Sequence, residues 1–261
     1  MVARYLILAL CLWLSSLPGS AHGDAALRFY YFNPDSPQHN LGRLKSDMES
    51  LLEGLGVPIE FQPFARLTDF NRGVRNDRPS FVFAPEWYLQ RYAEELQFRP
   101  LLQSVRDAQN SYRKLLIARR QATKETIKSG RASLAMTSLG PGSTDILGRI
   151  LLDDGDLSFD QLSIVEVPKD ADAIFAAALG QVEVALVSQA NLKQLQSINP
   201  RLIDSLQVLG ESEPLAMPVL GYLEGAATVD QQNVFKKFMI STHDSPVMQT
   251  LRIDGWSVHD E

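Results

Sequence analysis

Short apolar runs alternate with segments of helical periodicity along the whole chain. Residues 27–32 (LRFYYF) form an aromatic and apolar run of strand length, and residues 41–55 repeat leucines and a methionine at helical spacing after the turn residues 33–37 (NPDSP). This alternation predicts an α/β fold with a largely parallel sheet. In the first half we expect strands at 27–32, 59–64, 80–84 and 115–118, and helices at 41–55, 67–74 and 86–96.

The same pattern repeats in the second half of the chain. Two α/β units of similar size predict two lobes. The chain is expected to cross into the second lobe near Leu116–Arg120 and to return through Pro214–Tyr222. The expected strands are 132–136, 164–167, 182–187 and 206–209, and the expected helices are 143–152, 171–179, 190–198, 230–242 and 245–252.

The N-terminus has the pattern of a secretory signal peptide. Arg4 precedes the apolar run Tyr5–Leu14, and small residues follow, so cleavage is expected after Ala21 or Gly23. A transmembrane anchor is the alternative, but the run is shorter than the ~20 residues that span a bilayer. Cys11 lies inside the run and is the single cysteine. The exported chain would therefore have no disulfide, thiolate metal site or cysteine nucleophile.

The charge balance bears on the class of partner. The chain has a formal net charge of −6, and loss of Arg4 with the signal makes it one unit more acidic. An acidic chain without a basic run argues against nucleic acid or an anionic membrane as partner.

No pattern of catalytic or metal-binding residues emerges. Ser143 is not in a Gly-x-Ser-x-Gly turn, and Gly142 to Gly148 has the wrong spacing for a phosphate-binding P-loop. The histidines show no i, i+4 pairing, so zinc is not expected. We therefore predict neither an enzyme, nor a cofactor, nor a metal site; a hydrolase would need a nucleophile–base pair that the sequence does not reveal.

The segment around Gly142-Ser143-Thr144 is the strongest candidate for an anion site. It joins a predicted strand to a predicted helix, whose first N–H groups lack internal partners and carry the positive end of the helix dipole. Gly142 allows close backbone approach, and the two hydroxyls add donors. The alternative is an ordinary capped helix start, since Ser and Thr are common caps. Asp145 competes for the same dipole, which leaves two alternatives: either its side chain points aside, or the ligand is less anionic than phosphate.

Residues that follow the other strands would meet at the same crevice. Ligands of open α/β sheets sit beyond the carboxyl ends of the strands, which selects Asn33, Trp87 and Tyr88 along with Ser143 and Thr144. The two aromatic residues would form an apolar wall and a phenol donor. Their alternative role is helix packing in the first lobe.

Several motifs, in order along the chain, resemble one known family. They are Phe83-Ala84-Pro85-Glu86-Trp87-Tyr88, the Gly142-Ser143-Thr144 loop, the stretch from Asp172 through Gly180 to Ala185, and the tail Ile253-Asp254-Gly255-Trp256. Together they resemble the phosphate, phosphite and phosphonate-binding proteins of ABC importers. The resemblance covers nearly the whole chain after the signal.

The resemblance implies a two-lobed type 2 periplasmic-binding fold with the ligand between the lobes. Lobe 1 would comprise 24–116 plus 216–261, and lobe 2 would comprise 117–215. The protein would be a periplasmic monomer that delivers a small oxyanion to an ABC permease. Relatives hold a ligand amine with an acid near Asp170 and Asp172, for which a solvated helix start is the alternative. The expected ligand-binding residues are Asn33, Trp87, Tyr88, Gly142, Ser143, Thr144, Asp170, Asp172 and Ser188.

Two positions depart from the family pattern and leave a second function open. Ser188 stands where many relatives have an aspartate, which argues against an aminoalkylphosphonate ligand, and Asp145 stands beside the anion loop. The alternative is a ligand-sensing or interaction module of the same fold that signals to an envelope receptor or a sensor kinase.

Overall fold

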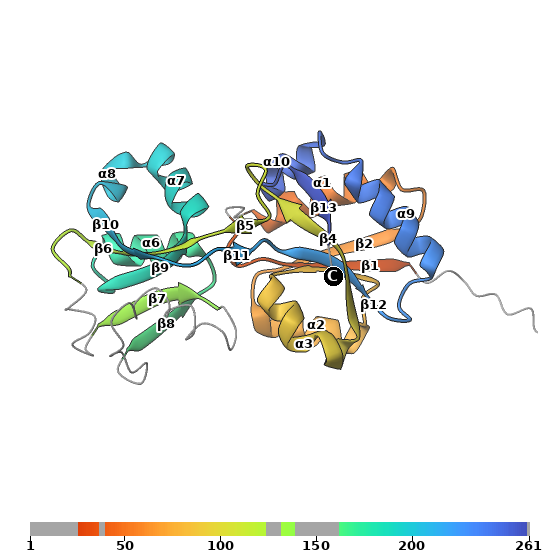
Figure 1. Ribbon diagram of the computed structural model, residues 1–261, viewed down its shortest axis with the longest axis horizontal. Helices are drawn as coiled ribbons and strands as arrows, with labels where there is room; N and C mark the ends of the chain where they lie inside the picture. Colours follow the sequence, from red (N-terminus) through yellow and green to blue (C-terminus); the bar gives the residue numbers. More distant parts are fainter. Residues whose placement is uncertain (1–25, 37–39, 124–131, 139–161, 260–261) are drawn as a thin grey trace, which may run out of the picture.

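Two β-sheets with their helices form two lobes, and a short two-stranded ribbon joins them (Figure 1). The computed structural model describes residues 26–36, 40–123, 132–138 and 162–259. Within these ranges no helix is long and apolar enough to span a bilayer. The ribbon pairs β5 (Ser111–Tyr112) with β11 (Leu215–Ala216) in antiparallel register.

Lobe 1 is built from both ends of the chain around a six-stranded sheet. Its strand order is β13-β4-β12-β3-β1-β2, so β12, from the C-terminal part, lies in the interior. The elements of lobe 1 are β1 (Leu27–Phe32), α1 (Leu41–Glu53), β2 (Ile59–Phe64), α2 (Leu67–Asp77), β3 (Phe81–Ala84), α3 (Glu86–Leu96), β4 (Phe98–Val105), β12 (Val219–Leu223), α9 (Val229–Ile240), α10 (Pro246–Leu251) and β13 (Gly255–Val258).

Lobe 2 is a continuous stretch of chain around a five-stranded sheet of order β10-β6-β9-β7-β8. The predicted boundary after residue 116 falls inside its first strand. The elements of lobe 2 are β6 (Lys114–Arg119), β7 (Ser133–Thr137), β8 (Ser163–Val167), α6 (Asp170–Ala178), β9 (Val184–Ser188), α7 (Gln189–Ile198), α8 (Pro200–Ile203) and β10 (Leu206–Glu211). The helix expected at 143–152 lies outside the described residues.

Both sheets are mixed, whereas the sequence pattern favoured largely parallel ones. In lobe 1 the parallel part is β1 with β2 and β3, and β12, β4 and β13 run antiparallel to their neighbours. In lobe 2 only β7, β8 and β9 are parallel. The antiparallel strands include those that carry the chain between the lobes and back, β6 and β12. The expected parallel strands form the part of each sheet whose carboxyl ends face the other lobe.

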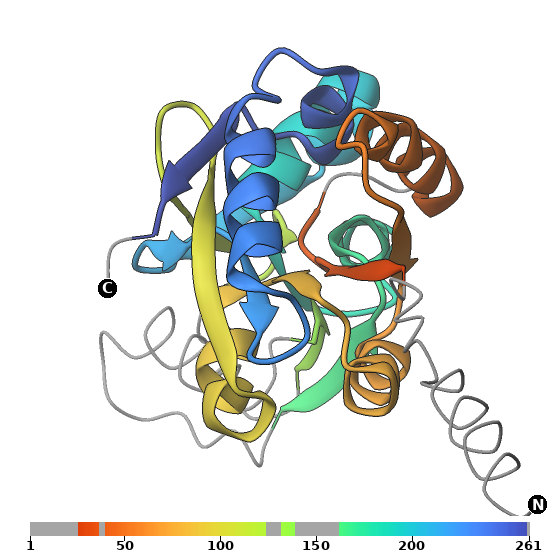
Figure 2. The same cartoon turned by 90° about the vertical axis from the view of Figure 1, so that its right-hand side faces the viewer.

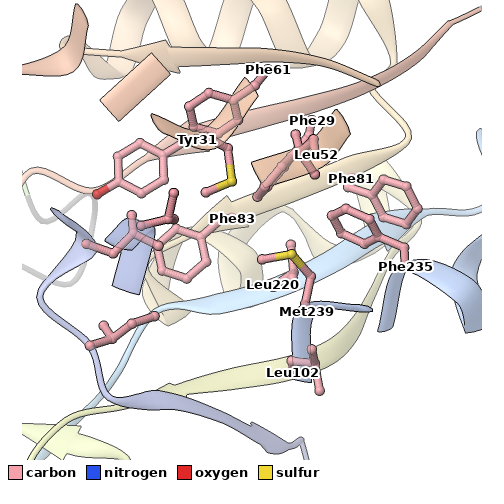
Figure 3. Close-up of a cluster of buried hydrophobic side chains, with 14 of the residues drawn as sticks. Phe29, Tyr31, Leu52, Phe61, Phe81, Phe83, Leu102, Leu220, Phe235 and Met239 are labelled. Atoms are coloured by element: carbon pink, nitrogen blue, oxygen red, sulfur yellow. The ribbon is translucent and has the colours of Figure 1, made fainter. Parts of the chain in front are cut away.

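Side chains that alternate along the lobe 1 strands pack into two separate cores, one on each face of the sheet. Phe29 of β1 and Phe81 of β3 face α1, α9 and α10, while Tyr30 and Val82 face α2 and α3. Figure 2 shows these two helical layers on opposite faces of the sheet. In the first core the ring of Phe235 stacks on Phe81 at a centroid distance of 3.8 Å (Figure 3). Strands buried on both faces explain why the sequence shows continuous apolar runs rather than alternation.

Helix packing in lobe 2 depends on small residues. Helix α6 buries Ala173, Ile174 and Ala177 against β6, β7 and β9. Small side chains let the helix approach the sheet closely. The N-terminus of α6 is thereby held next to the ends of β7 and β9, where the candidate site described below begins.

The pattern placed most described elements within a few residues but did not predict β5, β11, β12, β13, the short helix α8 or strand β4. Arg99, Pro100 and Gln103 interrupt its apolar run. Its pairing with β12 shifts register between Leu220 and Gly221, where Pro100 lies opposite Gly221. Proline cannot donate to the ladder, so the strand is recognisable only from its neighbours.

Gly221→Ala should destabilise lobe 1. A Cβ at this position would collide with the ring of Phe98 and the carbonyl oxygen of Arg99, both in the adjacent strand region. Overpacking of this kind costs about 1–3 kcal/mol, which urea denaturation would measure as a lower midpoint. The control is Gly42→Ala in α1, where the new methyl group meets only the Asn40 side chain at 3.4 Å. An equal loss in both variants would contradict the steric explanation.

Candidate functional site

A cleft of about 430 Å³ opens between the lobes, at the carboxyl ends of four parallel strands. Lobe 1 contributes residues that follow β1 and β2, and lobe 2 contributes residues from the ends of β7 and β8. This is the place at which ligands bind open α/β sheets. The described lining residues are Phe32, Pro34, Ala65, Arg66, Leu67, Thr68, Ser138, Glu166, Val167 and Pro168.

The cleft has a positive side and a negative side. On lobe 1, Arg66 is the N-cap residue of α2 and its side chain makes no capping hydrogen bond, so the positive end of the helix dipole lies beside an exposed guanidinium. On lobe 2, Glu166 is exposed at the end of β8. An anion would therefore be attracted to the Arg66 side.

A buried lysine lies at the junction of the lobes, and the side chains that hold it are close along the chain to residues that line the cleft. Lys114, the first residue of β6, is fully buried. Its Nζ donates to Asp35 Oδ1 at 2.7 Å and to Thr137 Oγ1 at 3.1 Å, and lies 3.6 Å from Asp170 Oδ1. Tyr112 donates its hydroxyl to Asp35 Oδ2 at 2.7 Å. Asp35 follows β1, so a lobe 1 carboxylate is held by groups of lobe 2 and of the ribbon.

Asp170 is held by the start of the next helix. Its Oδ2 accepts hydrogen bonds from the backbone N–H of Ser188 at 2.6 Å and from Asn191 Nδ2 at 3.0 Å. Asn191 Nδ2 also donates to Ser188 Oγ and to the backbone oxygen of Asp35, at 2.7 and 3.0 Å. Asp170 Oδ1 has no hydrogen-bond donor among the described residues. We call Asp35, Tyr112, Lys114, Thr137, Asp170, Ser188 and Asn191 the interlobe cluster.

Burial and charge act against each other in the interlobe cluster. Burial lowers the pKa of Lys114, but the carboxyl groups of Asp170 and Asp35 outweigh it and leave the pKa raised. Burial raises the pKa of Asp170, and Lys114 offsets this only in part. Burial, together with Asp35, raises the pKa of Tyr112 well above its usual value, so Tyr112 is a neutral donor. Lys114 is thus a charged ammonium at neutral pH.

The structure brings together part of the predicted site. Asp170 and Ser188 lie in the interlobe cluster, and Asn33 Oδ1 accepts the backbone N–H of Asp35 at 3.2 Å. Asp172 is exposed on α6. Gly142, Ser143 and Thr144 lie outside the described residues.

The aromatic residues of the predicted wall lie in the second core of lobe 1. The ring of Tyr88 is buried against Phe70 and Tyr92, with centroids 4.9 and 4.8 Å away, and Trp87 packs against the same core. Neither Trp87 nor Tyr88 is among the described residues that line the cleft. Phe32, which belongs to the same core, lines the cleft instead.

Sequence reasoning missed Asp35, Tyr112, Lys114, Thr137 and Asn191. Asp35 is part of a turn-rich segment, and aspartate is common in turns. Lys114 was the one available signal, because it is a charged residue at the start of an otherwise apolar buried strand. Its partners are 79 and 56 positions away, so no local pattern links them.

The fold and the cleft define a two-lobed solute-binding protein of the type 2 periplasmic-binding class. The sequence profile of the family described as "ABC transporter, phosphonate, periplasmic substrate-binding protein" matches residues 30–261. The chain therefore belongs to this family of periplasmic substrate-binding transport proteins. A search of curated protein sequences finds no match.

Solved structures share the fold at low sequence identity. One is a binding protein component of an ABC phosphonate transporter from Pseudomonas aeruginosa, with 17% identity, a TM-score of 0.73, and coverage of 90% of this chain and 82% of that one. Another is PhnD1 from Prochlorococcus marinus in complex with methylphosphonate, at 9% identity, TM-score 0.71, and 90% and 93% coverage. A histidine kinase sensor domain is also similar, at 14% identity, TM-score 0.56, and 87% and 94% coverage.

Lys114→Met should destabilise the protein in a pH-dependent way. It leaves two buried carboxyl groups without their cation, which costs about 3–5 kcal/mol near neutral pH. A carboxyl group whose folded pKa is raised, as for Asp170, supports stability at low pH and loses that support as pH rises through the folded pKa. Removing Lys114 enlarges this loss. The stability deficit against the native chain, from urea denaturation, should therefore shrink as pH falls toward about 4.

The control for this measurement is Lys45→Met. Lys45 forms a partly exposed i, i+4 pair with Glu49 at 3.6 Å, and such pairs contribute only about 0.3–0.5 kcal/mol. A deficit in Lys114→Met that stays constant between neutral and acidic pH would show that lost packing, and not unpaired charge, is responsible.

Proposed function

We propose that this protein captures a small phosphonate-like oxyanion in the cleft between its lobes and delivers it to the permease of an ABC importer. The main support for this proposal is the cleft at the carboxyl ends of β1, β2, β7 and β8, which has Arg66 and the start of α2 on one wall. Family membership supports the ligand class. Methylphosphonate, which PhnD1 holds in its complex, is the natural first probe.

The two walls would hold different parts of the anion. On lobe 1, the guanidinium of Arg66 offers charged donors to the oxygens, and the first N–H groups of α2 add the helix dipole. On lobe 2, we propose that Gly142, Ser143 and Thr144 supply backbone and hydroxyl donors. Ser138 lines the cleft only four positions before Gly142, which supports this assignment. Glu166 faces the same space and would disfavour ligands of high negative charge.

Export, a monomeric state and the absence of catalysis complete the function that we propose for this protein. We propose that the signal at residues 1–23 is cleaved, that the mature protein acts in the periplasm as a monomer, and that it releases its ligand unchanged. We further propose a division close to the expected 24–116 plus 216–261 for lobe 1 and 117–215 for lobe 2, but moved to the start of β6 at Lys114, with the β5–β11 ribbon as the hinge. Hinge closure around a ligand is the usual motion of two-lobed binding proteins.

A panel of oxyanions tests capture. Thermal unfolding should shift upward with methylphosphonate, phosphite, phosphate or a small carboxylate, because a ligand that binds only the folded state stabilises it. Absence of any shift, at concentrations far above micromolar, would overturn the proposal. Transport and sensing share this capture step, and stimulation of the permease's ATPase by the loaded protein separates them.

Arg66→Ala should weaken methylphosphonate binding about ten-fold or more, since a hydrogen bond to a charged group contributes roughly 1.5–3 kcal/mol. Titration calorimetry would measure the change. Glu166→Gln should act in the opposite direction by removing a like charge. The matched control is Arg72→Ala, which removes a charge from the same helix at an exposed pair with Asp69 outside the cleft lining. If Arg66→Ala and Arg72→Ala weakened methylphosphonate binding equally, the loss would come from the change in net charge and not from a contact of Arg66 with the ligand.

A further inference from the structure

The ammonium of Lys114 is held by side chains that are close along the chain to residues lining the cleft. It is surrounded by one residue that follows β1, one at the end of β7 and one at the start of α6, at 2.7, 3.1 and 3.6 Å. Three cleft-lining residues are one or two positions away from these neighbours. The pairs are Pro34 with Asp35, Ser138 with Thr137, and Pro168 with Asp170.

Without Lys114, the same groups would form a site for a primary ammonium ion. Asp35 and Asp170 present carboxyl groups from the two lobes toward one point, and Thr137 adds a hydroxyl. Asp170 Oδ1 is fully buried and has no hydrogen-bond donor among the described residues. These are the acceptors that an ammonium group needs in a buried place.

A ligand with an amino group would have to compete with Lys114 for this place. The lysine is attached to the chain, so its effective concentration at the carboxyl groups is high. It is already desolvated and paired, whereas the ligand's ammonium would lose its water and meet a like charge. The competition therefore favours the lysine.

We infer that Lys114 is a specificity-determining residue that fills an ammonium subsite from within the chain. The cleft then accepts small oxyanions without an amino group, such as alkylphosphonates, and rejects aminoalkylphosphonates. This selectivity rests on the proposed oxyanion capture. The existence of the subsite itself does not, because it depends only on the interlobe cluster.

The subsite is tested with Lys114→Ala and ethylammonium. The substitution vacates the space of a propylammonium group and leaves both carboxyl groups in place. Ethylammonium chloride should raise the Tm of Lys114→Ala by roughly 5 °C or more relative to sodium chloride at equal ionic strength. The native chain and Lys114→Met should show no such difference, because a side chain already fills the space. Adding Asp170→Asn to Lys114→Ala should abolish the response.

Every outcome of this experiment bears on the subsite. Where Lys114→Ala is unfolded on its own, recovery of folded protein in ethylammonium, but not in sodium chloride, supports it. A variant that neither refolds nor gains stability in ethylammonium counts against it. So does an equal response in Lys114→Met.

The selectivity is tested with a pair of ligands that differ in one group. The native chain should bind ethylphosphonate at least about ten-fold more tightly than 2-aminoethylphosphonate, and Lys114→Ala should narrow or reverse this ratio. Equal affinities of the native chain for both would overturn the selectivity. If the native chain binds neither ligand while Lys114→Ala responds to ethylammonium, oxyanion capture fails and the subsite stands.

Discussion

The ammonium of Lys114 must find negative partners in a place that water does not reach, and this requirement ties the two lobes together. A buried, unpaired charge costs far more than one protein can tolerate, so the carboxyl groups of Asp35 and Asp170 have to meet at the same point. Asp35 belongs to lobe 1 and Asp170 to lobe 2. The relative position of the lobes is thus coupled to the contacts of one buried ammonium with two carboxyl groups.

The remaining architecture serves to bring these side chains to that point. Asp35 lies just after the end of β1, and the four C-terminal residues of β1 are all buried in the two aromatic cores. Asp170 is the first residue of α6, and the alanines of α6 let this helix lie close to the sheet of lobe 2. Lys114 begins the strand by which the chain enters lobe 2. The cluster therefore lies where three rigid elements converge.

Sequence reasoning succeeded where a signal is local. The strand at 59–64 and the helix at 86–96 are found at their predicted bounds, because apolar runs and helical periodicity are properties of neighbouring residues. The two-lobed family fold was also predicted, from ordered motifs. Strand β4 was missed because a proline is unfavourable inside a strand, and its pairing opposite Gly221 at a register shift cannot be read from the local sequence. The partners of Asp170 were missed because ion pairs between distant segments leave no periodic trace.

The position of β12 has a consequence for how the chain assembles. This strand lies in the interior of the lobe 1 sheet, between β3 and β4, yet it is separated from them by the whole of lobe 2. A chain that emerges from its N-terminus can complete the continuous lobe first. Until residues 219–223 arrive, β3 and β4 have unpaired edges facing each other across the missing strand. Pairing over such a sequence separation is slow, and the sheet of lobe 1 can close only after the chain of lobe 2 has been made.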